Sequence, residues 1–405
     1  MIHFLFRRMT RKLGLTILAL LAIVLPLGVL NSIPIFSGAV DRSVLREELT
    51  AFNAALDRPP FGVRMYAYGT PSTPMSLRLA EDVLKTVEGM FRSNVGLPIL
   101  RAQLHAYSIK FGLETPKTID GRLPPGHPEY LHFAYYPGLE EHAETVTGTP
   151  YAGSEGPAVS GAETVEVWIR HDLAERMGVV VGDEFRCEAS RPLEDASYRT
   201  DDLEPIIEEP VTARVAGTWQ PKDLESNVWF GDPEAVLGDT LLVSRAGYEA
   251  AIEPRQRVKI HRATWDLVLD VESAAPDDAA TYLNGLRRIL RLMQQNIPSF
   301  LYDQAPISPL EGYVARDRVL TAQLLSFSIP GLGFIAIFLA LSASIVAGGH
   351  RRDTVSLMSR GFSPVKLLLL TSIEEVVLAL AGFPLGLGLA LVLARAMGHT
   401  RGFLQ

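Results

Sequence analysis

The chain has 405 residues, of which 47% are hydrophobic and 21% charged, and its mean hydropathy of +0.15 is high for a water-soluble protein. A net charge of −8 argues against a nucleic acid as partner. Because Cys187 is the one cysteine, no disulfide can form within the chain, and every domain must be stabilised by its core alone.

The hydrophobic surplus is concentrated in three runs, residues 13–30, 324–347 and 376–394, none of which contains Asp, Glu, Lys or Arg. A helix needs about 20 apolar residues to cross about 30 Å of hydrocarbon. The runs therefore predict three transmembrane helices, over residues 13–31, 323–349 and 373–397. The first run also resembles a signal peptide, but it is longer than a usual signal core and no clear cleavage site follows, so we interpret it as a retained anchor.

Basic residues predict the orientation of these helices. Residues 1–12 contain four Lys and Arg, and residues 350–372 contain four more. The positive-inside rule places both segments in the cytoplasm. Residues 32–322 then form a large extracytoplasmic domain and residues 398–405 a C-terminal tail, in a multi-pass protein of the inner or plasma membrane.

The domain between the first two spans combines helical and strand patterns. Apolar residues at helical spacing predict that the first span continues outward as an amphipathic helix, and period-two alternation predicts half-buried strands. Segments rich in Pro and Gly indicate connections, and an acidic stretch indicates a solvated loop. In chain order we expect a helix over 41–57, a strand over 61–68, a helix over 75–91, connections at 113–128 and 148–161, strands over 164–170, 211–219 and 264–271 with the acidic loop 193–210 among them, a helix over 277–295, and a segment over 311–323 that leads into the second span. The predicted fold class is a membrane protein with three transmembrane helices and a mixed α/β domain between the first and second.

No motif of an enzyme is present. The sequence lacks GxxxxGK[ST], HExxH, CxxC and GxSxG, and its nine histidines show no metal-ligand spacing. His127 and His132 are five apart in a region rich in Pro and Gly, where ordinary surface histidines are the simpler interpretation. We therefore expect no catalytic residue, no metal and no cofactor on this chain.

A short basic segment separates the second and third spans. On a helix starting near Asp353, apolar residues including Leu357 and Met358 can cover one side while arginines stay in water, as in an interfacial helix. Gly361 suits a helix C-cap, and Ser363 followed by proline suits the start of a new helix. This pattern predicts a short helix along the inner membrane face, an elbow, and a helix that enters the bilayer.

The residues of this segment resemble a known family. Arg351-Arg352-Asp353, then Ser359-Arg360-Gly361-Phe362-Ser363, then Glu374 ahead of a Gly-rich span, are similar to the signature of FtsX-like (MacB-type) ABC transporter permeases. The spacing matches from Arg351 to Gly386, although Asp353 replaces the usual Glu and Pro364 stands where a basic residue is more common. The stretches HDLAERMGVVVGDEF (171–185) and VTARVAGTW (211–219) are similar to segments of the family's extracytoplasmic domain.

The resemblance implies a function and partners. In that family the short cytoplasmic helix docks on a separate ABC-type ATPase subunit, which binds the ATP, and the permease relays ATP-driven motion to the outer domain by mechanotransmission, for export or release of substrate. A second permease chain, in a homodimer or heterodimer, and the lipid membrane are the other expected partners. The residues expected to contact the ATPase are Arg351, Arg352, Asp353, Leu357, Met358, Arg360, Gly361 and Ser363.

Further features leave alternatives open. Family members have four spans per core unit, whereas three are predicted here, so the chain is a fragment of a longer permease or a second polypeptide supplies a span. Gly382 and Gly386 can allow close approach of another helix, or can reflect the general frequency of glycine in membrane helices. Glu374 is either interfacial and solvated or paired with a neighbouring base.

The alternative function is a membrane-anchored extracytoplasmic ligand sensor, or a non-transporting regulator of an outer enzyme. A sensor needs a cytoplasmic output domain or a docking partner other than an ATPase. The longest predicted cytoplasmic piece is the elbow itself, which favours the permease interpretation.

Overall fold

The structure is a computed structural model that describes residues 13–55, 58–113, 127–153, 164–189, 209–224, 226–303, 305–359 and 363–398. Within the long helices only the backbone is described for several stretches, including 317–331 and 349–354. The chain divides into two compact units. We call Met1–Leu45 with Val314–Gln405 the helical unit, and Arg46–Tyr313 the sheet domain.

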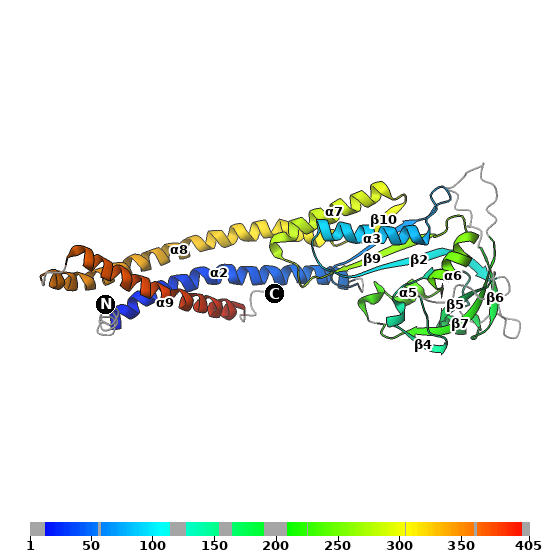
Figure 1. The fold of residues 1–405 in the computed structure, drawn as a ribbon, viewed down its shortest axis with the longest axis horizontal. Helices are drawn as coiled ribbons and strands as arrows, with labels where there is room; N and C mark the ends of the chain where they lie inside the picture. Colours follow the sequence, from blue (N-terminus) through cyan, green and yellow to red (C-terminus); the bar gives the residue numbers. More distant parts are fainter. Residues whose placement is uncertain are drawn as a thin grey trace. The chain divides into compact units, whose positions relative to one another are not determined.

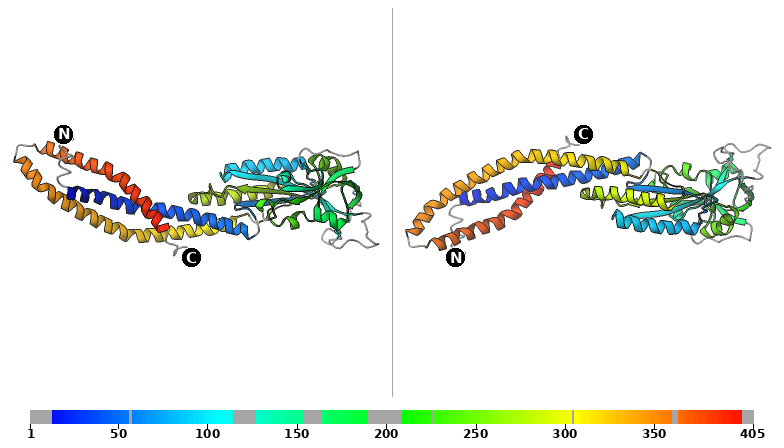
Figure 2. Two further views of the ribbon diagram at one scale, coloured as in Figure 1. Left: turned by 90° about the horizontal axis from the view of Figure 1, so that it is seen from below. Right: turned by 90° about the horizontal axis from the view of Figure 1, so that it is seen from above.

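Three long helices carry the hydrophobic runs: α2 (Leu13–Ala54), α8 (Ile307–Met358) and α9 (Pro364–Gly398) (Figures 1 and 2). In the described part of the chain, α2 and residues 371–396 of α9 are long and apolar enough to cross a membrane. The apolar stretch of α8 with described side chains, Leu332–Gly348, is shorter. The first and third predicted spans therefore meet the requirement for length and hydropathy. The second predicted span, in α8, stays a prediction.

The helix of the basic segment does not start where we expected. A new helix was predicted near Asp353, after a span ending at residue 349, but α8 runs from Ile307 to Met358 without a break. The reason is that Gly348 and Gly349 together cost only about 2 kcal/mol of helix propensity, and no proline accompanies them. The first span likewise continues past residue 31, and α2 reaches Ala54 as its periodicity predicted.

The described residues of the sheet domain form one sheet of ten strands, in the order β10-β1-β9-β2-β3-β8-β5-β7-β4, with β6 pairing with both β2 and β7. Most neighbours are antiparallel, but β3 with β8 and β5 with β7 are parallel pairs. The predicted mixed α/β domain is therefore confirmed. The strands are β1 (Gly62–Tyr68), β2 (Ile99–Leu113), β3 (Leu131–Tyr135), β4 (Ala143–Gly148), β5 (Thr164–Arg170), β6 (Glu184–Ala189), β7 (Val211–Pro221), β8 (Thr240–Leu242), β9 (Arg262–Leu269) and β10 (Phe300–Asp303).

Two amphipathic helices, α3 (Leu77–Asn94) and α7 (Ala279–Asn296), lie side by side on one face of the sheet (Figure 1), where α3 contacts β2 and α7 contacts β10. Ser76 caps α3 by accepting a hydrogen bond from the Leu79 N–H at 3.2 Å. The Trp265 indole of β9 donates to the Ala80 carbonyl of α3 at 2.9 Å, which ties helix to sheet. At three of the four ends of these helices, the predicted and observed bounds agree to within two residues. The agreement arises because the apolar stripes of both helices repeat at helical period.

The other half of the sheet has a core rich in tryptophan and tyrosine, with Trp168, Trp219 and Trp229 almost fully buried. Here β5 leads into α4 (His171–Met177), whose C-cap is Gly178 with φ +67°, a left-handed conformation that favours glycine. Gly182, with φ +92°, lies in the turn before β6. The remaining short helices are η1 (Leu139–Glu141), η2 (Asn227–Trp229), α5 (Pro233–Leu237), α6 (Arg245–Gly247), η3 (Tyr248–Ile252), η4 (Glu253–Arg255) and η5 (Pro276–Asp278).

The predicted connections are described only in part. Residues 114–126, 154–163 and 190–208, which include most of both Pro/Gly-rich connections and of the acidic loop, lie outside the described residues. The N-terminal segment 1–12 and the tail after residue 398 do as well.

Candidate functional site

The predicted ATPase-contacting segment spans the end of α8 and the start of α9. The Ser359 N–H closes the last turn of α8 by donating to the Val355 carbonyl at 3.0 Å, and α9 begins at Pro364. Proline suits this first helical position because its missing N–H would have had no partner there. The described part of this turn exposes Met358, 47% accessible, and Ser363.

The other predicted contact residues have less complete descriptions. Arg351, Arg352, Asp353 and Leu357 lie in the last turns of α8, where only the backbone is described, and Arg360 and Gly361 lie outside the described residues. The backbone therefore brings most of the predicted set to the end of one helix and the turn that follows it. Their contact with an ATPase stays a prediction.

The glycines of α9 lie against α2. A Cβ built on Gly382 would come within 2.8 Å of Ile23 Cγ2, and one on Gly386 within 2.8 Å of Leu27 Cβ. In return, a Cβ on Gly28 would lie 2.7 Å from Leu389 Cδ2. Because contacts advance in the same direction along both helices, α2 and α9 pack in parallel, with glycine on each side of the seam. Sequence reasoning missed Gly28, whose partner on the other helix no local pattern identifies.

The seam on α9 continues as a row of buried positions four residues apart. This row begins at Glu374, which is 7% exposed, and successive members are neighbours on the helix surface. Such small side chains let helix backbones approach closely, which is the main source of helix association in lipid. The row consists of Glu374, Leu378, Gly382, Gly386, Ala390 and Ala394.

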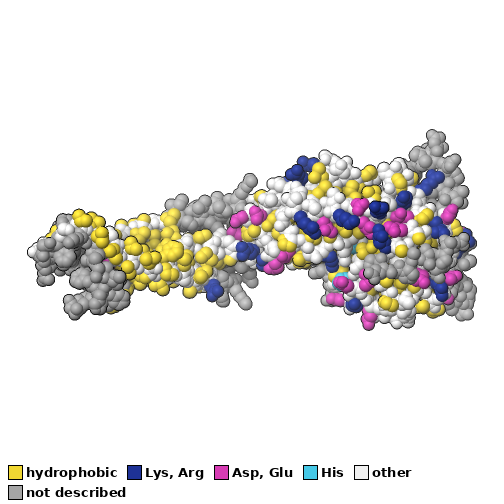
Figure 3. All heavy atoms as spheres, viewed as in Figure 1, with side chains coloured by type: hydrophobic (Ala, Val, Ile, Leu, Met, Phe, Trp, Pro, Cys, Tyr) yellow, Lys and Arg dark blue, Asp and Glu magenta, His cyan; other side chains and the backbone are white. Residues whose placement is uncertain are grey.

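The described apolar stretch of α8 presents large side chains outward. Phe334 is 75% exposed, Leu341 60% and Ile337 59%, while Ser342 is buried at 3%. Figure 3 shows hydrophobic side chains over the described helical unit and charged side chains over the sheet domain. This arrangement inverts that of a water-soluble protein and fits a helix surrounded by lipid or by other helices.

The sheet domain contains a buried ion pair on the sheet face opposite α3 and α7. Arg64 of β1 donates two hydrogen bonds of 2.7 Å to the Asp266 carboxylate of β9, and a third to the Phe230 carbonyl at 3.1 Å. Asp266 is 1% exposed. His105 of β2 lies next to it, with Nδ1 3.6 Å from Asp266, and burial lowers the pKa of His105 to about 3, so its ring is neutral at pH 7.

Sequence reasoning missed this ion pair. In β9, Asp266 lies between two core positions, Trp265 and Leu267, so the alternation of the strand indicates that Asp266 points to the face opposite theirs. The alternation could not show that Arg64, 202 residues away, would lie directly opposite.

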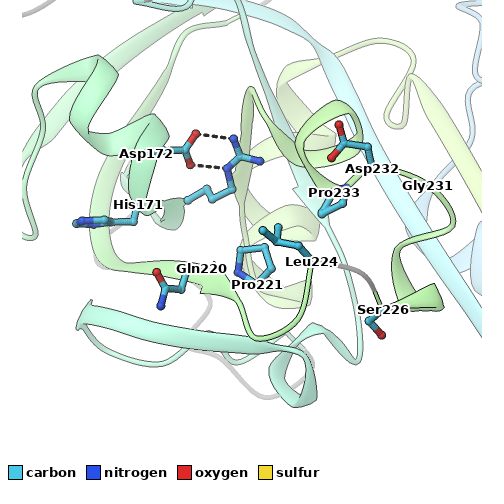
Figure 4. A pocket seen from close by; sticks show the side chains of 10 residues that line it. His171, Asp172, Gln220, Pro221, Leu224, Ser226, Gly231, Asp232 and Pro233 are labelled. Atoms are coloured by element: carbon cyan, nitrogen blue, oxygen red, sulfur yellow. Dashed lines mark hydrogen bonds and ion pairs between the residues drawn. The ribbon is translucent and has the colours of Figure 1, made fainter. Parts of the chain in front are cut away.

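Two hollows bordered by described residues of the sheet domain differ in size. The larger, about 870 Å³, is open and is bordered by Arg170, His171, Gln220 and Asp232 among others (Figure 4). The Arg170 guanidinium donates two hydrogen bonds to the Asp172 carboxylate. The smaller cavity, about 270 Å³, lies over β1, β9 and β2.

Comparison with known proteins gives little. No family model matches the chain, and no curated protein matches it. Among solved structures, a domain assigned to a permease protein from Porphyromonas gingivalis shares 10% identity, covering 60% of this chain and 86% of that one, with a TM-score of 0.26. A likeness at this TM-score does not establish a shared fold.

Proposed function

We propose that the chain is the transmembrane permease subunit of an ABC transporter of the FtsX-like, MacB-type class. The observation that carries the proposal is α8, a single helix that begins at Ile307 in the sheet domain and ends at Met358, next to the turn that resembles the family's coupling segment. A helix resists bending, so a push at one end reaches the other. The resemblance from Arg351 to Gly386 supports the same conclusion.

In the proposed mechanism the turn lies in the cytoplasm and docks on a separate ATPase subunit. ATP binding and hydrolysis on that subunit move the turn through Arg351, Arg352 and Arg360. Because α9 packs tightly on α2 through Gly382 and Gly386, the first and last helices move as a pair. The pair and α8 then act on the sheet domain from its two helical connections, and no substrate has to cross the bilayer for this work to be done.

The proposed assembly contains at least two further polypeptides, an ABC-type ATPase and a second permease chain of the same or another sequence. The exposed apolar side chains of α8 offer a surface for helices of that second chain or for lipid. Export or release of a substrate on the outer side of the membrane is the proposed outcome.

The test is co-purification from detergent extracts of the native membrane. Wild-type chain is compared with a variant carrying Arg360→Glu and Gly361→Pro, and with a control, Arg288→Glu, on an exposed position of α7. We expect mass spectrometry to identify an ABC-type ATPase with wild type and control, and its loss with the double variant.

A second variant tests transmission rather than docking. Ala347→Pro breaks α8 between the turn and the sheet domain. We expect the ATPase still to co-purify while transport-linked ATP hydrolysis in proteoliposomes becomes uncoupled. If no ATPase is recovered with the wild-type chain, the proposal fails and the ligand-sensor alternative is favoured.

A further inference from the structure

The small cavity over β1, β9 and β2 has a polar lining. Cross-strand neighbours on this face are polar: Tyr66 lies opposite Thr264, Tyr68 opposite Arg262, and Arg262 opposite Tyr107. Because residues directly opposite in adjacent strands point to the same side of a sheet, these side chains line one hollow. A polar, cation-bearing face of this kind differs from the apolar face that α3 and α7 cover.

Buried polar groups at the cavity lack hydrogen-bond partners in the described part of the chain. Both ring nitrogens of His105, a residue 1% exposed that lines the cavity, have none, and neither has Nε of Arg262. Behind them, the Tyr136 hydroxyl is also without a partner, and its ring stacks on His105 with centroids 3.7 Å apart. Nearly all buried polar atoms in proteins are hydrogen-bonded to protein, water or a ligand, so these atoms are available to the polar groups of a molecule in the cavity.

Among the described residues, one cation that lines the cavity, Arg262, has no carboxylate to neutralise it. Asp266 neutralises Arg64, and Arg58 neutralises Asp303 at 2.7 Å. Arg262 lies over the ring of Tyr107 at 4.4 Å, and among the described residues no carboxylate forms a salt bridge with it. Of the charged side chains that line the cavity, Arg262 is therefore the cation that no described carboxylate neutralises, which suits a singly charged anionic group.

The walls indicate the rest of the ligand. Three tyrosines, Tyr66, Tyr68 and Tyr107, and Val236 supply ring faces and apolar surface, with hydroxyl groups at their edges. A volume of about 270 Å³ is near the lower limit of ligand sites, about 300 Å³. The space therefore suits a small organic molecule rather than a polymer or a lipid chain.

We propose that this cavity binds a small organic monocarboxylate, with the carboxylate on the Arg262 guanidinium and the body of the molecule against the tyrosine rings. The planar guanidinium matches a carboxylate through two parallel hydrogen bonds. His105 supplies a neutral ring nitrogen to the ligand's polar atoms. This inference concerns the sheet domain alone and does not depend on coupling to an ATPase.

The test uses the full chain in a non-ionic detergent and isothermal titration calorimetry. The probes are benzoate, cinnamate and hexanoate, with benzamide as the neutral counterpart of benzoate and inorganic phosphate as a more highly charged oxyanion. We expect at least one carboxylate to bind saturably, with one site per chain, and benzamide to bind about tenfold more weakly than benzoate or worse.

Matched variants locate the site. Arg262→Gln removes the charge and is expected to weaken carboxylate binding about tenfold or more. Arg288→Gln, the same change at an exposed position of α7 on the other face of the sheet, is expected to leave affinity within about twofold. Circular dichroism establishes that each variant is folded.

A measurement on the wild-type chain covers the case in which Arg262→Gln does not fold. Photolysis with para-azidobenzoate is expected to label peptides containing Tyr66 and Tyr68 or Tyr107, and excess benzoate is expected to suppress the labelling. The proposal is wrong if none of the three carboxylates binds, if binding survives Arg262→Gln unchanged, if phosphate binds and carboxylates do not, or if the label maps elsewhere.

Discussion

The two units of this chain bury opposite kinds of side chain. In the sheet domain the fully buried residues are large, including Trp219, Trp229 and Trp265. In the helical unit the buried row of α9 is mostly glycine and alanine, while large residues such as Phe334 and Leu380 are exposed. Water drives large apolar groups inward, whereas lipid does not, and close helix contact then depends on small residues.

The units also differ in how they handle charge. The sheet domain buries a complete ion pair, Arg64 with Asp266, that is held by several hydrogen bonds. The three hydrophobic runs of the helical unit contain no charged residue at all. The comparison can be tested by substitutions that should be severe in one unit and harmless in the other.

The largest effect is expected from Asp266→Ala. This change leaves the Arg64 guanidinium buried without its counter-ion, and breaking a buried pair in this way costs about 3–5 kcal/mol of unfolding free energy. The measurement is urea unfolding of the full chain in detergent, followed by tryptophan fluorescence. As a control, Asp82→Ala breaks an exposed pair with Lys85 and should cost less than about 1 kcal/mol. Equal losses in the two variants would contradict the assigned burial of Asp266.

How much of this could be predicted from sequence depends on the range of the interactions. Helix α7 and strand β9 were found because their apolar spacing is local. Strand β2 was missed, although it is the longest, because its central run of buried residues does not alternate.

The candidate sites were less predictable than the fold. The pairing of Gly386 with Leu27 and of Arg64 with Asp266 joins residues hundreds of positions apart, and no periodicity reports such contacts. The continuity of α8 past Gly348 was missed because the end of a hydrophobic run was equated with the end of a helix. Hydropathy marks the limits of the membrane, and backbone hydrogen bonding marks the limits of the helix.

A smaller loss is expected from Gly386→Val in the seam between α2 and α9. The new Cβ would lie 2.8 Å from Leu27 Cβ and 3.4 Å from the Val24 carbonyl oxygen, and overpacking of this kind costs about 2 kcal/mol. Gly388→Val is a matched control on the same helix, because nothing lies within 4 Å of its Cβ position. Unfolding in mixed micelles with increasing sodium dodecyl sulfate compares the two variants. Equal stability would show that the seam is not tight.

The free energy of unfolding is expected to decrease at acid pH because of His105. Burial lowers its pKa to about 3, against about 6.5 in an unfolded chain, so between these values the unfolded state binds more protons and stability falls as pH falls. From pH 7 to pH 5 the loss is about 2 kcal/mol, with Asp266, Arg64, Arg101 and Arg262 as the charged neighbours.

The measurement for His105 is the difference between wild type and His105→Gln in urea unfolding at pH 7 and pH 5. Burial also lowers the pKa of His132 and His261, which remain in both proteins, so the difference isolates His105. We expect a smaller decrease between the two pH values in the variant. An unchanged pH dependence would mean that His105 is accessible to protons in the folded chain.

The smallest effect is expected from Phe334→Ala on α8. Although a large aromatic side chain is removed, Phe334 is 75% exposed, and hydrocarbon contacts it as readily in the unfolded as in the folded state. Unfolding in mixed micelles should therefore change by less than about 0.5 kcal/mol. In the sheet domain the same change at Phe133, which is fully buried, should cost about 3–5 kcal/mol. A loss above about 1 kcal/mol for Phe334→Ala would mean that protein rather than lipid covers this side of α8, and would make that surface the candidate contact for the second chain that we propose.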